Sequence, residues 1–173
     1  DAPKTGEVLV KVVAAGVCHT DIGVQHIMPM PVVLGHEGSG IVEEVGPGVT
    51  KVAPGDPVVM TFGSCGRCPS CVEGAPSHCH DMRTLQFSGA RFDGSPTMSQ
   101  QGEKVNAAFF QQSSFATYAL ATERNVVKIT QGDVPLELLG PLGCGIQTGA
   151  GAVMNTIKAR AGGSIAVMGA GSV

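Results

Sequence analysis

Four cysteines lie close together in the polar, glycine-rich stretch SCGRCPSCVEGAPSHC, residues 64–79. The stretch has no apolar periodicity, so no hydrophobic core of its own can order it. A disulfide across two intervening residues is strained, and a redox pair needs only one Cys-x-x-Cys within a thioredoxin-like βαβ pattern. Four thiolates about 2.3 Å from one Zn²⁺ would order such a loop. The spacing therefore favours a zinc site over the other two interpretations, with the ligands Cys65, Cys68, Cys71 and Cys79.

This zinc would be structural, because four protein ligands leave no open position on the metal. Gly66 and Gly74 are expected to provide the turns that bring the thiols together. His78 and His80 flank the last cysteine and could compete as ligands. Since four thiols are available, we expect both histidines to lie on the surface.

The remaining two cysteines are far apart in the chain. Cys18 begins the motif CHTD, Cys144 lies in GPLGCGIQTG, and between them His36 and Glu37 occupy GHEGSG. Two thiols and an imidazole would make three protein ligands, which together with an open position define a catalytic zinc. The alternative is that the cysteines are small buried residues and the histidine a satisfied turn residue. The residues alone leave both interpretations open.

The rest of the chain indicates a mostly β domain followed by the start of an α/β domain. Short β-branched runs bounded by glycine and proline predict strands, whereas small and apolar residues at helical spacing predict a helix over 146–159. The stretch ARAGGSIAVMGAG predicts a turn, a strand and a turn. We place the domain boundary near Leu142. The other predicted strands are at 7–17, 41–45, 115–120 and 126–129, and the stretch PGDPVVM, residues 54–60, predicts a turn followed by a strand.

Composition and charge limit the possible partners. The net charge is −3, so there is no basic footprint for nucleic acid, and no apolar run approaches the roughly 20 residues of a membrane span. The amino terminus shows no signal peptide, and we expect a cytoplasmic protein. Charged residues make up only 14% of the chain, which suggests that a partner subunit or further chain covers part of the surface. Both ends interrupt a motif, as in a fragment of a longer protein.

Several motifs in the same order resemble the zinc-dependent, medium-chain alcohol dehydrogenases. They are CHTD, GHEGSGIVEEVGPGV, the four-cysteine loop and GPLGCGIQTGAGAV. The stretches PMPVVLGHEGSG, QQSSFATYAL and ELLGPLGCGIQTGAGAV look most like the aryl-alcohol (benzyl-alcohol) branch. The resemblance covers almost the whole chain. It implies a GroES-like, partly open β-barrel over residues 1–142, with a structural-zinc loop at about 64–80, and the truncated start of a Rossmann domain over 143–173.

The resemblance also implies a role for individual residues. The catalytic zinc ligands would be Cys18, His36 and Cys144, with the carboxylate of Glu37 beside the metal and Asp21 orienting the histidine. Thr20 would pass on the proton of the alcohol, although from the residue type alone a turn hydroxyl is the simpler interpretation. The cofactor-binding positions would be His19 near the pyrophosphate, Thr148 beside the nicotinamide, and Gly169 and Gly171 at the start of a dinucleotide fingerprint.

The activity implied is the reversible oxidation of a primary alcohol, aryl or allylic, to its aldehyde, with two zinc ions per chain and hydride transfer to NAD, in a homodimer or homotetramer. Alternatives are a glutathione-dependent formaldehyde or aliphatic alcohol dehydrogenase, and a non-catalytic, zinc-ordered interaction module. Residues 1–173 alone are expected to be inactive.

Two positions depart from the family pattern. Gly23 occupies the place where some relatives carry a proton-relaying histidine, and we expect His26 to be solvent-exposed without a relay role. The four phenylalanines that could wall an aromatic pocket are more simply explained as core residues, namely Phe62, Phe109, Phe110 and Phe115.

Overall fold

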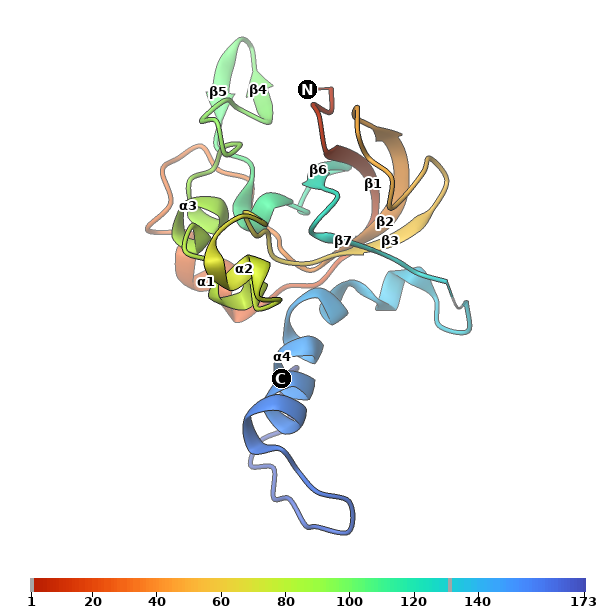
Figure 1. The fold of residues 1–173 in the computed structure, drawn as a ribbon. Helices are drawn as coiled ribbons and strands as arrows, with labels where there is room; N and C mark the ends of the chain where they lie inside the picture. The colour runs from red at the N-terminus through yellow and green to blue at the C-terminus, as the bar shows by residue number, and fades with distance from the viewer. Residues whose placement is uncertain (1, 131) are drawn as a thin grey trace.

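The computed structural model describes residues 2–130 and 132–173. Its body is an antiparallel five-stranded sheet with the strand order β6-β1-β2-β3-β7 (Figure 1). A separate hairpin pairs β4 with β5. The strands are β1 (Glu7–Ala15), β2 (Gly38–Val45), β3 (Pro57–Met60), β4 (Met98–Gln100), β5 (Glu103–Val105), β6 (Tyr118–Thr122) and β7 (Val126–Lys128).

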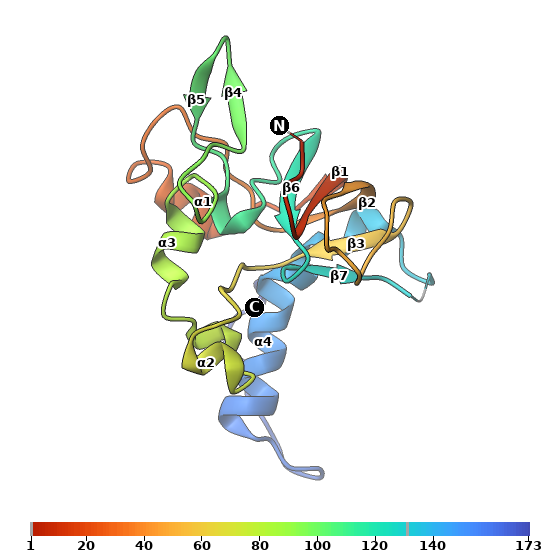
Figure 2. The ribbon, with the colours of Figure 1, turned by 45° about the horizontal axis from the view of Figure 1, so that its top comes forward.

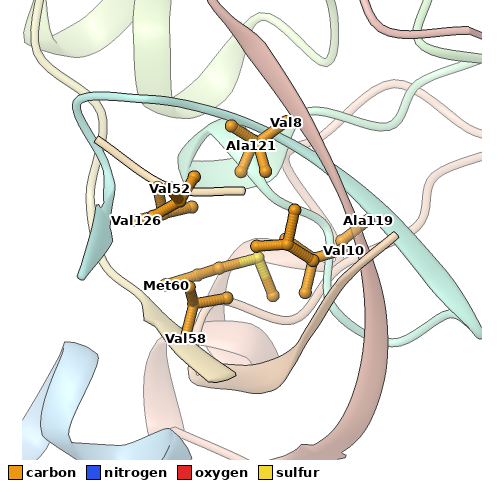
Figure 3. Close-up of a cluster of buried hydrophobic side chains, with 9 residues drawn as sticks. Val8, Val10, Val52, Val58, Met60, Ala119, Ala121 and Val126 are labelled. Carbon is orange, nitrogen blue, oxygen red and sulfur yellow. The ribbon is translucent and has the colours of Figure 1, made fainter. Parts of the chain in front are cut away.

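The sheet curls into a half-barrel around one apolar core. The register between β1 and β2 shifts twice, between Leu9 and Val10 and between Val12 and Ala14, and such bulges bend a strand. Side chains alternate along β1, so that Val8 and Val10 are fully buried. Each valine buried in this way contributes about 1.5–3 kcal/mol. Figure 3 shows this core, whose buried members are Val8, Val10, Val42, Val52, Val58, Met60, Ala119, Ala121 and Val126.

Short helices lie beside the sheet, and the last one leads away from it (Figures 1 and 2). The α-helices are α1 (His19–Val24), α2 (Pro69–Val72), α3 (Met82–Phe87) and α4 (Gly145–Gly151). A π-helical turn, η5 (Ala152–Ile157), continues α4. In the described part of the chain, no helix has the length and apolar character to cross a membrane. The 3₁₀ turns are η1 (Pro76–His78), η2 (Phe109–Gln111), η3 (Leu136–Leu138) and η4 (Gly140–Gly143).

The structure confirms the mostly β fold and most of the predicted elements. The five strands of the main sheet coincide with the predicted runs to within a few residues, and the helix predicted over 146–159 is formed by α4 and η5. The β4–β5 hairpin and helices α1 and α3 were not predicted, because their segments are short and carry weak periodicity.

The predicted strand near Ser164–Gly171 is wrong for this structure, since residues 158–173 contain no regular element. A β-strand needs a neighbouring strand to pair its backbone groups, and no strand of the described residues lies beside this segment. The segment instead folds back, so that its last two residues approach α4 at Gly145 and Gly149.

Candidate metal centres

The four clustered cysteines form one compact group. Their sulfur atoms lie within 4.8 Å of one another, and the Sγ atoms of Cys65 and Cys71 are 4.0 Å apart. Four sulfurs at about 2.3 Å from a tetrahedral zinc would be separated by about 3.8 Å, so the spacing fits that ion. All six cysteines of the chain are unpaired, which contradicts the disulfide interpretation.

Backbone N–H groups donate hydrogen bonds to sulfur atoms of this group. Amide N–H groups of Cys65, Cys68 and His80 donate to sulfur at 3.3–3.5 Å. Donors from the backbone lower the pKa of Cys68 to about 6, whereas desolvation and hydrogen bonds with neighbouring thiols raise the pKa of Cys71 to about 11. Four thiolates this close repel one another unless a cation lies between them, so the donor set suits zinc.

The turns of this loop are as predicted. Gly66 and Gly74 adopt positive φ angles of 70° and 82°, a region that glycine enters without strain. His78 and His80 are exposed, and His80 approaches Ser70 through its ring nitrogen at 3.3 Å. Neither histidine belongs to the sulfur group.

The candidate ligands that are far apart in the sequence also lie close together in the structure. Ligand atoms of Cys18, His36, Glu37 and Cys144 all lie within 4.8 Å of one another. The end of β1 and the start of α1 place Cys18, the turn before β2 places the His-Glu pair, and η4 delivers Cys144 at the start of α4. The fold thereby joins positions that are up to 126 residues apart (144 − 18).

Asp21 determines the orientation of His36. Its Oδ1 lies 3.1 Å from the ring Nδ1 and also accepts the backbone N–H of Gly35 at 2.9 Å, while Oδ2 accepts the N–H of Cys18 at 3.0 Å. Both residues are almost completely buried. Burial alone would lower the pKa of His36, but the hydrogen bond and charge of Asp21 outweigh it and raise that pKa. A carboxylate at Nδ1 directs the unprotonated lone pair to Nε2.

Two observations show that this second group fits a cation. The Nε2 of His36 is buried and, among the described residues, has no hydrogen-bond partner, although buried polar atoms are normally paired. Burial and the negative charges of Cys18 and Glu37 raise the pKa of Cys144 to about 12. A zinc ion would accept the lone pair and neutralise the thiolates, so the residues present fit it.

An open cavity of about 560 Å³ borders this group, because Cys144 is one of its walls. Aromatic and thioether side chains line much of the rest, including Phe62, Met82, Phe87 and Phe110. Of the four phenylalanines considered as pocket walls, Phe62 and Phe110 line the cavity. The other two do not: Phe109 is completely buried in the core, and Phe115 is 41% exposed outside this cavity.

The other expected site residues are placed as follows. Thr20 lies beside the cluster, with Oγ1 3.6 Å from the sulfur of Cys18. Thr148 lines the cavity and donates from its hydroxyl to the carbonyl of Cys144 at 2.7 Å. His19 is exposed at the first position of α1. Away from the cluster, His26 is exposed, as are Gly169 and Gly171 in the irregular carboxy-terminal segment.

Phe87 is a cavity residue that the sequence did not indicate. It lies at the end of α3 and contacts Phe110 in an edge-to-face arrangement, with ring centroids 5.7 Å apart. The segment that carries it has no motif, so only its position in the fold reveals this role.

The chain thus combines a curled antiparallel β domain with a four-thiol loop and a separate two-thiol, one-imidazole cluster. Residues 4–131 match the family described as alcohol dehydrogenase GroES-like domain. The chain belongs to this family.

Two curated relatives support the assignment of the chain to this family. The chain is 54% identical to a probable alcohol dehydrogenase of a Pseudomonas species, over 91% of this chain and 51% of the relative. It is 52% identical to geraniol dehydrogenase of Castellaniella defragrans, over 99% of this chain and 46% of the relative. The chain thus spans about half the length of the curated relatives it matches.

Solved structures show the same fold. The alcohol dehydrogenase zinc-binding domain protein of Burkholderia ambifaria superposes with a TM-score of 0.89 at 54% identity, covering 95% of this chain and 45% of that chain. Benzyl alcohol dehydrogenase of Acinetobacter calcoaceticus superposes with a TM-score of 0.82 at 52% identity, covering 91% of this chain and 43% of that chain. The family, the four-thiol group and these neighbours support zinc as the metal.

Proposed function

We propose that this chain is the catalytic part of an NAD-dependent zinc alcohol dehydrogenase that interconverts a primary aryl or allylic alcohol and its aldehyde. The observation that carries the proposal is the meeting of Cys18, His36 and Cys144 beside an aromatic-lined cavity. Residues 1–142 would form the catalytic domain, and residues 143–173 would begin a dinucleotide-binding domain.

The chain's own residues have distinct tasks in this reaction. Cys18, His36 and Cys144 would hold a zinc ion, which when bound supplies a Lewis acid for the substrate oxygen. Asp21 keeps the imidazole in one tautomer and one orientation. The hydroxyl of Thr20, 3.6 Å from the sulfur of Cys18, would relay the proton that leaves the alcohol oxygen, accepting it as its own hydroxyl proton passes to water.

The carboxylate of Glu37 lies beside the three proposed metal ligands. It is almost completely buried, and its Oε1 accepts the backbone N–H of Gly145 at 3.3 Å. The contact links Glu37 to the residue that follows Cys144. A carboxylate placed there adds negative charge to the ligand set and favours retention of a divalent cation.

NAD would be held by His19, Thr148, Gly169 and Gly171, and it would supply the acceptor for the hydride of the alcohol. The position of Thr148 on the cavity wall supports this arrangement. The four residues of the other sulfur group, Cys65, Cys68, Cys71 and Cys79, would hold a second zinc with a purely structural role. The proposal also includes a cytoplasmic location and assembly of the protein into a homodimer or homotetramer.

The aryl or allylic preference has two supports. The cavity presents the rings of Phe62, Phe87 and Phe110, and flat apolar walls favour planar, unsaturated substrates through ring contacts. The relatives named for geraniol and benzyl alcohol share more than half of their aligned residues with this chain. The relatives named class-3 alcohol dehydrogenase share fewer, at 42% and 38%.

Initial rates of the full-length protein with NAD test the proposal. We expect kcat/KM for benzyl alcohol and geraniol to exceed that for ethanol and for hydroxymethylglutathione. Metal analysis should give two zinc ions per chain, with one lost in Cys144→Ser. A preference for hydroxymethylglutathione would make this a glutathione-dependent formaldehyde dehydrogenase, and a full-length protein without turnover on any of these alcohols would favour the non-catalytic zinc module.

A further inference from the structure

The side chain of Gln112 bridges the backbone on both sides of Glu37. Its Oε1 accepts the N–H of Gly38 at 3.1 Å, and its Nε2 donates to the carbonyl of His36 at 2.9 Å. The same Nε2 donates to the carbonyl of Thr61 at 3.1 Å. Gln112 is only 2% exposed, so water cannot readily replace these bonds.

Thr61 extends this connection to the third ligand. Its hydroxyl donates to the carbonyl of Gly143 at 2.8 Å, next to Cys144. Hydrogen bonds therefore run from the His36 carbonyl through Gln112 and Thr61 to the residue before Cys144. The two ligand segments come from distant parts of the chain, and Gln112 and Thr61 link them through hydrogen bonds.

The residues around Gln112 have strained backbone conformations, which place the ring of Phe110 against His36. Phe110, Gln111 and Ser113 have φ angles of 51°, 57° and 50°, in a region that residues other than glycine rarely occupy. Such conformations persist where surrounding contacts over-determine them, and they cluster at functional sites. Here the turn lays the ring of Phe110 on that of His36, with centroids 4.6 Å apart and planes inclined by 26°.

We propose that Gln112 is a positioning residue that sets the separation of the His36 and Cys144 segments and so tunes the geometry of the catalytic metal site. The inference rests on the proposed function. Without the amide, the buried carbonyl of His36 and the N–H of Gly38 lose this partner, and the carbonyl of Thr61 keeps only its bond from Asn125. Unsatisfied buried groups drive local rearrangement. Partners that orient metal ligands typically change metal affinity or activity by about 10–100-fold.

The neighbouring Gln111 provides a matched control. It is also buried, and its amide donates to the carbonyls of Leu85 and Ala90 at 2.8 and 3.5 Å. Neither bond involves a ligand-bearing segment of the catalytic site. A general loss of packing should therefore affect variants of both glutamines, whereas a change in metal geometry should follow from Gln112 alone.

The test compares Gln112→Met and Gln111→Met in the full-length protein with cobalt in place of zinc. We expect Gln112→Met to shift the visible cobalt–thiolate bands of the catalytic site and to speed its loss of metal to a chelator about tenfold, with the four-cysteine site unchanged. Gln111→Met should leave those bands and that rate as in the wild type. Thr61→Val, which removes the bond to Gly143 but keeps the side-chain volume, should shift the same bands.

Wild-type bands and metal retention in both Gln112→Met and Thr61→Val would overturn the inference, as would equal shifts in Gln111→Met. If Gln112→Met does not fold, Thr61→Val decides by the same criteria. A Cys144→Ser variant that retains both metal ions would instead refute the proposed function, so the two failures can be told apart.

Discussion

Replacing Asp21 by asparagine isolates the contribution of one buried carboxylate to the catalytic metal site. In the structure Oδ1 serves both the Nδ1 of His36 and the N–H of Gly35, while Oδ2 serves the N–H of Cys18. An asparagine that keeps its oxygen in the Oδ1 position retains the first two bonds. Its NH₂ group then faces the N–H of Cys18, so one partly buried donor loses its acceptor and the site loses a negative charge.

The magnitude follows from that single lost acceptor. An unsatisfied buried donor costs about 1–3 kcal/mol, and each 1.4 kcal/mol corresponds to about a factor of ten in binding. The backbone at Cys18 must shift to find another partner, which moves its sulfur away from His36. We therefore expect Asp21→Asn to weaken metal binding at the catalytic site by about 10- to 100-fold, in the range found for such supporting carboxylates.

The assay is competition with a chelator, followed by metal analysis of the protein. Asp21→Asn should lose one zinc ion per chain at chelator concentrations that leave the wild type fully loaded, and it should keep the zinc of the four-cysteine group. Asp56→Asn is the control, because Asp56 pairs with Lys128 at 2.7 Å and belongs to neither ligand group. Equal retention of both metals in Asp21→Asn and the wild type would refute the reasoning.

Four further predictions concern other parts of the molecule. Cys65→Ser should lower the free energy of unfolding by several kcal/mol in urea titrations, since the loop has no core of its own; unchanged stability would contradict a structural zinc. Phe62→Ala should reduce kcat/KM for benzyl alcohol by about tenfold relative to ethanol, from the lost ring contact. The Cys144 thiol has a pKa of about 12 before metal binds, so it must release a proton on binding. Affinity at this site should then rise by about tenfold per pH unit for each displaced proton between pH 6.5 and 8.5, and a pH-independent affinity would exclude that release. Residues 1–173 expressed alone should show no NAD-dependent turnover, and measurable turnover would contradict the proposal that residues 143–173 are only the start of a dinucleotide-binding domain.

Local patterns were sufficient for the elements whose partners are close in sequence. The four-cysteine group could be predicted because its ligands lie within residues 65–79 and its turns contain glycines with positive φ. The main strands could be predicted because short β-branched runs bounded by glycine and proline, such as the run that forms β1, favour strands wherever their partners lie.

Elements that depend on distant partners could not be predicted in the same way. The strand expected near Ser164 is absent because no neighbouring strand pairs with it. Phe87 carried no motif, and its contact with Phe110 arises only when α3 and η2 pack together. Gln112 lies in the stretch QQSSFATYAL, but that stretch gave no sign of its bond to the His36 carbonyl. Of the candidate aromatic residues, the fold placed Phe62 on the cavity and Phe109 in the core.

The sequence by itself determined the chemistry available to this protein: six thiols, an imidazole and their likeness to a family of zinc enzymes. Only the tertiary structure decided that sulfur from the start of α1, nitrogen from the turn before β2 and sulfur from the start of α4 share one small volume. The physical reason is that a metal site of distant residues depends on how strands and helices pack, and packing is a property of the whole fold.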